Sequence, residues 1–473
     1  MNAGAPSGHG AGQLAELNER ALAAHRAGRS LEALQIFDTL LDAAPGIAVL
    51  HSNRATVLAD LGRDAEALPA FTRAIEIDHH HLEARLGLGA LLRRRGAVTE
   101  ALGCYRIAAE RAPERLDAHL AIYELAQIVG DRATALAHQR RALAIRRLFS
   151  EDAVAPPARK RVLAVKMPGD WQANLPIEYV LDRTTTAIHT YFVDLVELRA
   201  PTTALPACDI IFNTIAESDE AAPILAALPA FARRLGLPLI NDPQRVLAVA
   251  RGRFPSLLAT IPRCRAPQAL RFARAELTPE RIAAAGIAPP FLLRPQASHG
   301  GNDLVRIEAW DAIAPYLAGL AETEFYATPF VDYAGADGYF RKYRVIFVDG
   351  EPFPYHLAIS PGWMVHYYSS GMRENEWMRA EEAAFLGDLG SVFDAGLQDA
   401  LRRLAAAVGL DYFGLDCSVT REGELLVFEI ETGMIVHDLD PVELYPYKPA
   451  AFRRIQSALD ALILRRIAAA KAA

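Results

Sequence analysis

Three carboxylates near the end of the chain have the spacing of a divalent-cation site. Asp416 lies in one stretch of largely apolar residues, and Glu429 and Glu431 lie two residues apart in the next. The turn Arg-Glu-Gly between the stretches predicts a hairpin that pairs 415–420 with 425–430. Because alternate residues of a strand point to one face, Glu429 and Glu431 are expected to share a face beside Asp416.

Carboxylates placed this closely repel each other unless a cation joins them. Mg²⁺ (or Mn²⁺) that bridges nucleotide phosphates takes hard oxygen ligands, so the predicted metal ligands are Asp416, Glu429 and Glu431. The apolar residues of the second strand are expected on its opposite face: Leu426, Phe428 and Ile430. The alternative is a solvated polar face of an edge hairpin.

A polar, glycine-containing loop is a candidate for contact with phosphate. Strand 291–294 presents Arg294, and after a loop the chain turns back into 304–307. Glycines let backbone N–H groups approach phosphate oxygens, and hydroxyl and imidazole groups add donors. The loop residues predicted to make such contacts are Ser298, His299, Gly300 and Gly301. The alternative is a plain turn, and neither a GxxxxGK[ST] nor a GxGxxG motif occurs in the chain.

A third cluster contains basic side chains at the start of a predicted strand. Arg341, Lys342 and Arg344 occur together, and strand alternation puts Lys342 and Arg344 on one face. Two cations on an inward face need an anion, for which a phosphate or a carboxylate would serve. The alternative is ordinary surface charge.

The first 150 residues repeat with a period of 34 residues, as the distance from Gly28 to Gly62 illustrates. Glycine, alanine, leucine and an aromatic residue recur in register, at Gly28, Gly62, Gly96 and Gly130, at Ala33, Ala67, Ala101 and Ala135, at Leu34, Leu68, Leu102 and Leu136, and at Phe37, Phe71 and Tyr105. This pattern resembles the tetratricopeptide repeat (TPR), in which helix hairpins stack into a solenoid. The resemblance implies a concave face that binds a peptide or a partner protein.

Composition and hydrophobic pattern predict a multidomain chain, in which an all-α solenoid precedes an α/β and then an α+β region. The predicted segments are a disordered N-terminus (1–12), helical repeats (13–150), a proline-containing linker (151–160), a small parallel α/β subdomain (161–262) and an α+β region (263–473). The α/β subdomain is expected to contain strands at 161–166, 194–198, 209–213 and 237–241. The α+β region is expected to contain a hairpin of 343–348 with 352–359, and helices at 395–408 and 448–467.

Taken in order, these features resemble the ATP-grasp superfamily over residues 161–467, and most closely its D-alanine ligase, glutathione synthetase and RimK-like members. The family's metal signature, an Asp followed downstream by Glu-x-Asn, corresponds to Asp416 and Glu429-Ile-Glu431, with Glu431 in place of Asn. Arg294 stands where the family has a phosphate-contacting Lys, and a second family Lys falls near Arg253. Arg344 corresponds to the family's phosphate-contacting Arg.

The resemblance also implies an adenine site on the strand that links the two halves of the domain. The matching segment contains Thr328, Phe330 and Val331, whose backbone would contact adenine, and Asp332 would reach the ribose. Segment 209–217 resembles the substrate-side strand of the D-alanine ligase group.

The resemblance implies an ADP-forming, ATP- and Mg²⁺-dependent carboxylate–amine ligase that works through an acylphosphate, with Arg344, Arg294 and Lys342 as catalytic groups. A peptide, protein or carrier-bound substrate is expected, recruited by the repeats. Three alternatives remain open: a small-molecule kinase on the same scaffold, a degenerate domain that binds nucleotide without turnover, and a pure TPR scaffold.

Composition excludes several other classes of function. The net charge of −7 argues against nucleic-acid binding, and no apolar stretch is long enough to span a membrane. The four cysteines are scattered, which predicts neither a disulfide framework nor a thiolate zinc site. We therefore expect a cytoplasmic protein, with homodimerisation left open.

Overall fold

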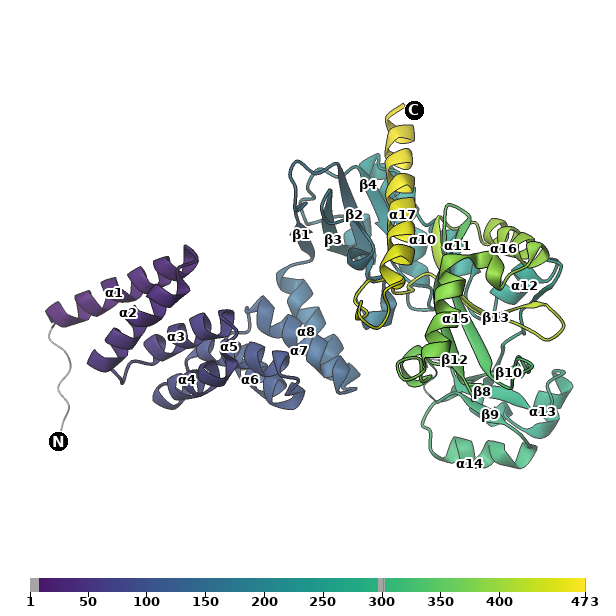
Figure 1. Ribbon diagram of the computed structural model, residues 1–473, viewed down its shortest axis with the longest axis horizontal. Coiled ribbons are helices and arrows are strands. Elements are labelled where there is room, and N and C mark those ends of the chain that lie inside the picture. Colours follow the sequence, from purple (N-terminus) through teal and green to yellow (C-terminus); the bar gives the residue numbers. More distant parts are fainter. Residues whose placement is uncertain (1–7, 297–300, 302, 473) are drawn as a thin grey trace. The chain divides into compact units, whose positions relative to one another are not determined.

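A computed structural model of the chain describes residues 8–296, 301 and 303–472 (Figure 1). The chain divides into two compact units. The first contains Met1–Arg147 and Pro168–Asp170, and the second contains Leu148–Met167 and Trp171–Ala473. Three residues of the predicted phosphate loop, Ser298, His299 and Gly300, lie outside the described residues.

The first unit is built from helix hairpins that follow the sequence repeat. Its helices are α1 (Gly8–Arg26), α2 (Ser30–Ala43), α3 (Ala48–Asp60), α4 (Asp64–Ile77), α5 (Leu82–Arg94), α6 (Val98–Arg111), α7 (Leu116–Ile128) and α8 (Arg132–Ile145). The recurring glycines each follow the first helix of a hairpin and have φ between +73° and +80°, a conformation that disfavours other residues. The recurring alanines, Ala33, Ala67, Ala101 and Ala135, are fully buried.

Close contacts of α5 with the helix before it and the helix after it explain its glycines. Phe71 of α4 is 1% exposed. A Cβ atom on Gly87 would lie 2.4 Å from the Phe71 ring, and one on Gly89 would lie 3.0 Å from the Tyr105 ring. Glycine at both positions lets the aromatic side chains pack directly onto the helix backbone, and the helical-repeat prediction is confirmed.

The structure differs from the predicted boundaries at both ends of the repeats. Helix α1 begins at Gly8, within the segment 1–12 for which disorder was predicted. Helix α8 ends at Ile145, and strand β1 (Leu148–Glu151) follows and pairs with β3. The apolar Leu148 and Phe149 account for this strand, because Phe149 packs edge-on against Phe192 at a ring distance of 6.2 Å.

The second unit begins with a five-stranded sheet in the order β1-β3-β2-β4-β5, in which only the edge strand β1 is antiparallel. The remaining strands are β2 (Lys160–Lys166), β3 (Thr186–Phe192), β4 (Ile210–Asn213) and β5 (Leu239–Ile240). Helices α9 (Leu195–Arg199), α10 (Ala222–Leu235), α11 (Pro243–Ala248) and α12 (Phe254–Leu258) accompany them. The strand predicted at 194–198 is wrong, because the Asp194 carboxylate accepts a hydrogen bond from the Glu197 N–H and caps α9.

A four-stranded antiparallel sheet follows, in the order β7-β10-β8-β9. Its strands are β7 (Leu270–Ala273), β8 (Phe291–Pro295), β9 (Val305–Ile307) and β10 (Glu324–Pro329), with helices α13 (Pro279–Ala284) and α14 (Ile313–Ala318). This sheet has a hydrophobic core of its own around Phe291, Leu293 and Phe325.

The last sheet carries most of the candidate site and has the order β12-β11-β13-β14-β6. Its strands are β6 (Cys264–Arg265), β11 (Phe340–Val348), β12 (Glu351–Ser360), β13 (Tyr412–Val419) and β14 (Leu425–Glu431). The helices are α15 (Glu376–Gly387), α16 (Ala395–Val408) and α17 (Lys448–Ala472). The tight turn at Asp349 and Gly350, both with positive φ, confirms the predicted hairpin of β11 and β12.

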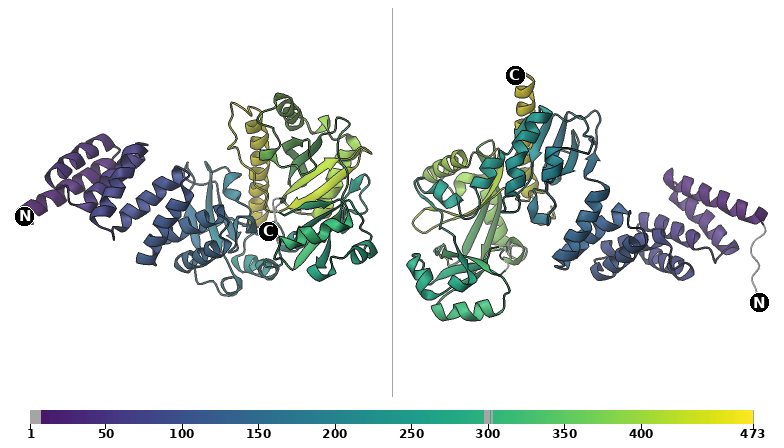
Figure 2. Two further views of the ribbon diagram at one scale, coloured as in Figure 1. Left: turned by 90° about the horizontal axis from the view of Figure 1, so that it is seen from below. Right: turned by 180° about the vertical axis from the view of Figure 1, so that it is seen from behind.

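Two hydrophobic cores join the first and last sheets of the second unit. One contains Leu163 of β2, Phe347 of β11 and Leu404 of α16. The other contains Phe212 of β4, Tyr412 of β13 and Leu459 of α17, and Figures 1 and 2 show α17 running beside the first sheet. These shared cores fix the last sheet, which carries Asp416, Arg344 and Glu429, against the first sheet.

Candidate functional site

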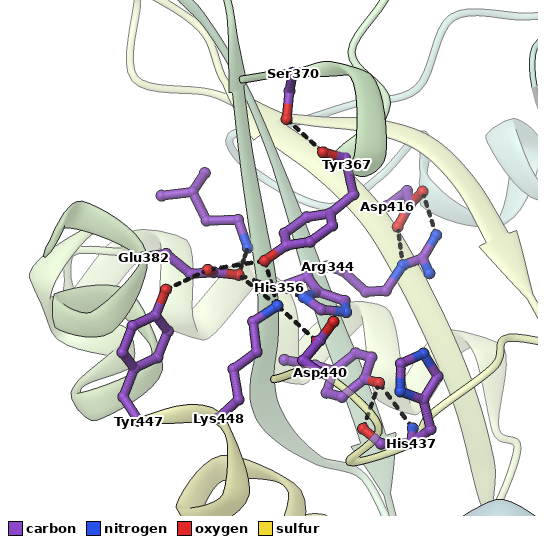
Figure 3. A network of polar contacts seen from close by, with 12 residues as sticks. Arg344, His356, Tyr367, Ser370, Glu382, Asp416, His437, Asp440, Tyr447 and Lys448 are labelled. Atoms are coloured by element: carbon purple, nitrogen blue, oxygen red, sulfur yellow. Dashed lines mark hydrogen bonds and ion pairs between the residues drawn. The ribbon is translucent and has the colours of Figure 1, made fainter. Parts of the chain in front are cut away.

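Asp416 is the centre of a buried charge cluster in the middle of the last sheet. In the strand ladders Asp416 lies opposite Arg344 of β11 on one side and Glu429 of β14 on the other. It is 1% exposed. Arg344 donates Nε–H to Oδ1 at 2.8 Å and Nη2–H to Oδ2 at 3.0 Å, and the Lys342 ammonium lies 3.1 Å from Oδ2 (Figure 3 shows the Arg344–Asp416 pair).

The two cations on the β11 face therefore share a carboxylate partner. Burial alone would raise the pKa of Asp416, yet the charges of Arg344 and Lys342 outweigh burial and hold that pKa well below its usual range. Burial opposes the charge on Arg344, but Asp416 and the neighbouring glutamates raise the pKa of Arg344 above its ordinary value. Asp416 and Arg344 are thus both charged near neutral pH.

A β-bulge changes which side chains of β14 share a face. Asp416 pairs with Glu429 and Cys417 pairs with Val427, so Phe428 is an extra residue in β14. Leu425, Val427 and Ile430 enter the main core, whereas Leu426 and Phe428 pack near Tyr333 in a separate cluster. The prediction that Leu426, Phe428 and Ile430 share one face is therefore wrong, because strict alternation ignores the inserted residue.

Glu429 and Glu431 lie at the end of β14 in different surroundings. Arg251 donates Nη2–H to Glu429 Oε2 at 3.1 Å. Burial first, and then the charge of Glu429, raise the pKa of Glu431 above its ordinary value. Glu217, which follows β4, accepts a hydrogen bond from Thr432 Oγ1 at 3.3 Å, and burial raises its pKa to about 7.

The three predicted metal ligands, Asp416, Glu429 and Glu431, lie on paired strands as expected, but their carboxylate groups do not converge on one point. Across residues 8–296, 301 and 303–472, no three His, Cys, Asp or Glu side chains converge closely enough to hold a metal ion. Asp416 uses both carboxylate oxygens for Arg344 and Lys342. Glu429 and Glu431 remain the side chains with hard oxygen donors that suit Mg²⁺ at this position.

Arg294 contributes a cation from the four-stranded sheet. It lies in β8 opposite Tyr326 of β10. Burial, together with the charge of Arg251, lowers the pKa of Arg294 to about 10, while Glu429 raises it. Two arginines from different segments thus act electrostatically on the same carboxylate, Glu429.

Gly301 is the residue of the predicted phosphate loop that the structure describes. Its φ is +79°, and a Cβ atom there would lie 2.4 Å from His366 Nε2. The positive φ favours glycine, and a Cβ atom would force the His366 ring to shift, so backbone conformation and packing both account for glycine at position 301.

Arg251 is a site residue that the sequence did not identify. The resemblance pointed to Arg253, but the Arg253 side chain is exposed and its Nη1 donates to the Leu247 carbonyl at 3.4 Å. Arg251 lies two residues earlier in the same Arg-Gly-Arg sequence and contacts Glu429 instead. The resemblance placed a cation in this segment but named Arg253, whereas Arg251 faces the carboxylate.

The predicted adenine segment occupies the end of β10 and the residues after it. Thr328 pairs with Leu292 of β8, and the Phe330 ring packs edge-on against Trp363 at 5.9 Å. The Asp332 carboxylate accepts the Ala334 N–H at 3.0 Å and so stabilises a turn. Val331 packs near Tyr333.

Comparison with known proteins identifies similarity over a minor part of the chain. No family model matches. The chain is 37% identical over 86 residues to DnaJ homolog subfamily C member 3 of Rattus norvegicus, which is 18% of this chain and 16% of that protein. This chain therefore spans about a sixth of the length of that curated relative.

Two solved structures share a comparable fraction of the chain. The crystal structure of MamA has 17% identity, covers 28% of this chain and 77% of its own, and gives a TM-score of 0.27. YrrB, described as a TPR protein with an unusual peptide-binding site, has 27% identity, covers 27% of this chain and 65% of its own, and gives 0.25. The helix hairpins of the first unit form a helical repeat that resembles the TPR, and a mixed α/β region with several sheets follows it. Within the described part of the chain, no helix has the length and apolar character needed to cross a membrane.

Proposed function

We propose that the second unit is an ATP-grasp-like, ATP- and Mg²⁺-dependent carboxylate–amine ligase. The observation that carries this proposal is a group of cationic side chains around the carboxylates of β13 and β14. The cations come from the last sheet, from the four-stranded sheet and from the segment between α11 and α12. Arg344 and Lys342 contact Asp416, and Arg251 contacts Glu429. A partly buried site with cations and hard oxygen donors side by side suits a nucleoside triphosphate with its metal ion.

The reaction has two steps in which atoms and charges balance. A carboxylate oxygen of the substrate attacks the γ-phosphorus of ATP, the bond to the β,γ-bridging oxygen breaks, and ADP leaves. The amine nitrogen of the second substrate then attacks the acyl carbon, inorganic phosphate leaves, and the nitrogen loses a proton to form the amide.

The protein's contribution is to position groups and neutralise charge. Arg294 and Arg344 are proposed to hold the transferred phosphoryl group, and Lys342 is proposed to exchange part of its contact with Asp416 for phosphate. Glu429 and Glu431 would hold Mg²⁺, which neutralises phosphate charge when bound. Ser298, His299 and Gly300 are proposed to contact phosphate as well, with the adenine near Thr328, Phe330 and Val331.

Release of ADP measured with MgATP tests the proposal. Glu429→Gln should lower turnover roughly a hundredfold to a thousandfold, since it removes a carboxylate proposed to hold Mg²⁺ at the phosphates. Glu443→Gln, at an exposed position beyond the same strand, is the matched control and should be unaffected. Equal turnover in wild type and folded Glu429→Gln would contradict the assignment.

The choice of acceptor separates the ligase from the alternative functions. A ligase releases ADP faster when a carboxylate and an amine are supplied together. A small-molecule kinase would respond to polyols instead, and a degenerate domain would bind nucleotide without ADP release.

For the repeat unit we propose that it recruits a peptide or protein substrate. The favouring observation is an open hollow of about 330 Å³ on the repeats. Leu116 and Leu120 offer apolar surface there, and Arg146 brings a positive charge, whereas Arg115 is paired with Asp117 and Glu83. Such a surface suits an extended segment with an apolar side chain near a carboxylate.

Peptides selected from a random display library on the full-length protein test this second function. Leu120→Asp should weaken the selected peptides at least about tenfold, because a charge would enter the apolar part of the hollow. Leu31→Asp, at a position 67% exposed, serves as the control. Unchanged binding by Leu120→Asp would move the docking site elsewhere.

A further inference from the structure

A buried lysine occupies an ammonium-sized site behind the candidate reaction centre. Lys448 begins α17, and its side chain is 7% exposed. Its Nζ lies 2.8 Å from Asp440 Oδ2 and 3.7 Å from Glu382 Oε1, and it donates to the Tyr367 hydroxyl (Figure 3). Two carboxylates therefore balance one ammonium away from solvent.

Two aromatic rings complete the enclosure. Lys448 Nζ lies 4.0 Å from the centre of the Tyr367 ring and 4.2 Å from the centre of the Tyr445 ring. Aromatic faces attract cations, and the attraction grows when the cation is desolvated. We call Tyr367, Tyr445, Glu382 and Asp440 together the ammonium cage.

Hydrogen bonds fix Glu382 of α15, the member of the ammonium cage whose side chain is fully buried. Tyr447 donates its hydroxyl to Glu382 Oε2 at 2.6 Å, and Tyr367 donates to the same oxygen at 3.2 Å. The other oxygen lies 3.3 Å from His356 Nδ1. His356 is the ladder partner of Arg344, so the network extends to the residue that holds Asp416.

The ammonium cage also fixes a segment that lacks regular structure. Residues 432–447 join Glu431, the last residue of β14, to Lys448 without forming a helix or strand. Tyr355 provides a second anchor, because its hydroxyl accepts the His437 N–H at 2.8 Å and donates to the His437 carbonyl at 3.0 Å. Side chains rather than a backbone ladder thus determine where this segment lies.

We propose that Lys448 is a positioning residue, whose ammonium in the cage fixes segment 432–447 and the adjoining end of β14 for the reaction. This inference rests on the proposed ligase function for its catalytic consequence, and on the cage geometry alone for its structural part. The two carboxylates require a cation, and both ring centres lie within 4.2 Å of Nζ, so we expect the cage to prefer a small primary ammonium to a neutral molecule.

Chemical rescue of Lys448→Ala tests the structural part. The substitution removes a propylammonium-sized group, so added n-propylammonium should refill the cage. We expect a lower Tm and faster deuterium uptake by 432–447 in the variant, and recovery of both with n-propylammonium but not with n-propanol. Lys471→Ala, at an exposed lysine of the same helix, should behave like wild type under all conditions. Equal effects of propylammonium and propanol would overturn the cage assignment.

ADP release from the same samples tests the catalytic part. Lys448→Ala should lower kcat at least tenfold with little change in the KM for ATP, and n-propylammonium should restore kcat. A wild-type kcat in the unrescued variant, despite mobile 432–447, would overturn the positioning role. If wild type itself releases no ADP with any acceptor, the proposed function fails, while the thermal and exchange results still decide whether the cage is correct.

A measurement on the intact protein covers the case in which Lys448→Ala does not fold. The chain contains only five lysines, Lys160, Lys166, Lys342, Lys448 and Lys471, so acetylation can be followed at each by mass spectrometry. Lys448 should resist acetylation far longer than Lys471, and Tyr445→Leu should make it reactive. If Lys448 reacts as fast as Lys471 in wild type, the inference is wrong.

Discussion

The repeat unit (the first unit) and the α/β unit (the second unit) differ in how far apart in sequence their key contacts lie. In the repeat unit, Gly87 accommodates the ring of Phe71, which lies sixteen residues earlier in the chain. In the α/β unit, Arg251 reaches Glu429 across 178 residues, and Arg344 reaches Asp416 across 72. Local contacts recur and produce a sequence period, whereas distant contacts occur once and leave none.

The comparison implies different responses to substitution. Each repeat contacts mainly its neighbours, so damage should remain local and graded. The charge cluster of the α/β unit depends on several sheets at once, so the loss of one group should affect both stability and chemistry.

Asp416→Asn should have the largest effect, because it acts on stability and chemistry together. It leaves Arg344 and Lys342 without their carboxylate partner in a buried site, which should cost about 3–5 kcal/mol of stability. ADP release should fall on the order of a thousandfold. Denaturant unfolding with hydrogen exchange of β13 peptides measures the first effect, and ADP release measures the second. Asp438→Asn, at an exposed position, is the control.

Two outcomes would change the picture of the charge cluster. If Asp416→Asn is as stable as wild type, the pairing with Arg344 and Lys342 contributes little. If its stability falls while ADP release is unchanged, Asp416 is structural, and the reaction centre lies elsewhere.

Phe71→Ala should destabilise the repeat unit by a similar amount without changing the chemistry. Removing a buried ring leaves a cavity, with a typical cost of about 3–5 kcal/mol. Hydrogen exchange should rise in α4 and α5, while the peptides of β11 to β14 keep wild-type protection. Increased exchange throughout the chain would show that the two units unfold as one.

The same contrast explains what the sequence revealed of the fold. The repeat helices were predictable because glycine, alanine and an aromatic residue each meet a recurring steric demand. Strands with a tight turn, such as β11 and β12 around Asp349 and Gly350, were also predictable. The segment 194–198 was wrongly assigned as a strand, because its apolar residues outweighed the capping role of Asp194.

The candidate site was less accessible to sequence reasoning. Spacing brought Lys342 and Arg344 to one face, but it did not reveal that Asp416 binds both. The bulge at Phe428 carries no sequence signal, and the choice between Arg251 and Arg253 depends on how the chain turns between α11 and α12. Contacts between distant segments emerge only in the folded chain, and the Glu382–Lys448 network is a further example.

Arg251→Ala should weaken nucleotide binding by roughly tenfold, because it removes the cation that offsets the charge of Glu429 beside the proposed phosphate site. Arg253→Ala should leave it unchanged, since that side chain is exposed. Titration with a non-hydrolysable ATP analogue compares the two. The reverse order of sensitivity would favour Arg253, the position that the resemblance implies, over Arg251, which contacts Glu429.

The smallest expected effect is a pH dependence confined to the repeat unit. His138 of α8 lies with its Nδ1 2.8 Å from His119 Nδ1, and His119 Nε2 lies 2.9 Å from the Pro113 carbonyl. The carbonyl can only accept, so neutral His119 carries its proton on Nε2 and accepts at Nδ1 from His138. Burial first, and then nearby positive charge that includes Arg141 and Arg106, lowers the pKa of His138 to about 4 from the ordinary 6.5. The unfolded chain therefore binds this proton at a higher pH than the folded chain does. The contribution to stability is fully present above pH 6.5 and is lost as the pH falls towards 4.

His138→Gln keeps a donor for His119 but does not titrate, so its Tm should fall less than that of wild type between pH 7 and pH 5. His80→Gln, at an exposed position, should retain the wild-type pH dependence. If the Tm of His138→Gln falls as steeply as that of wild type, other groups govern the acid sensitivity of the repeats.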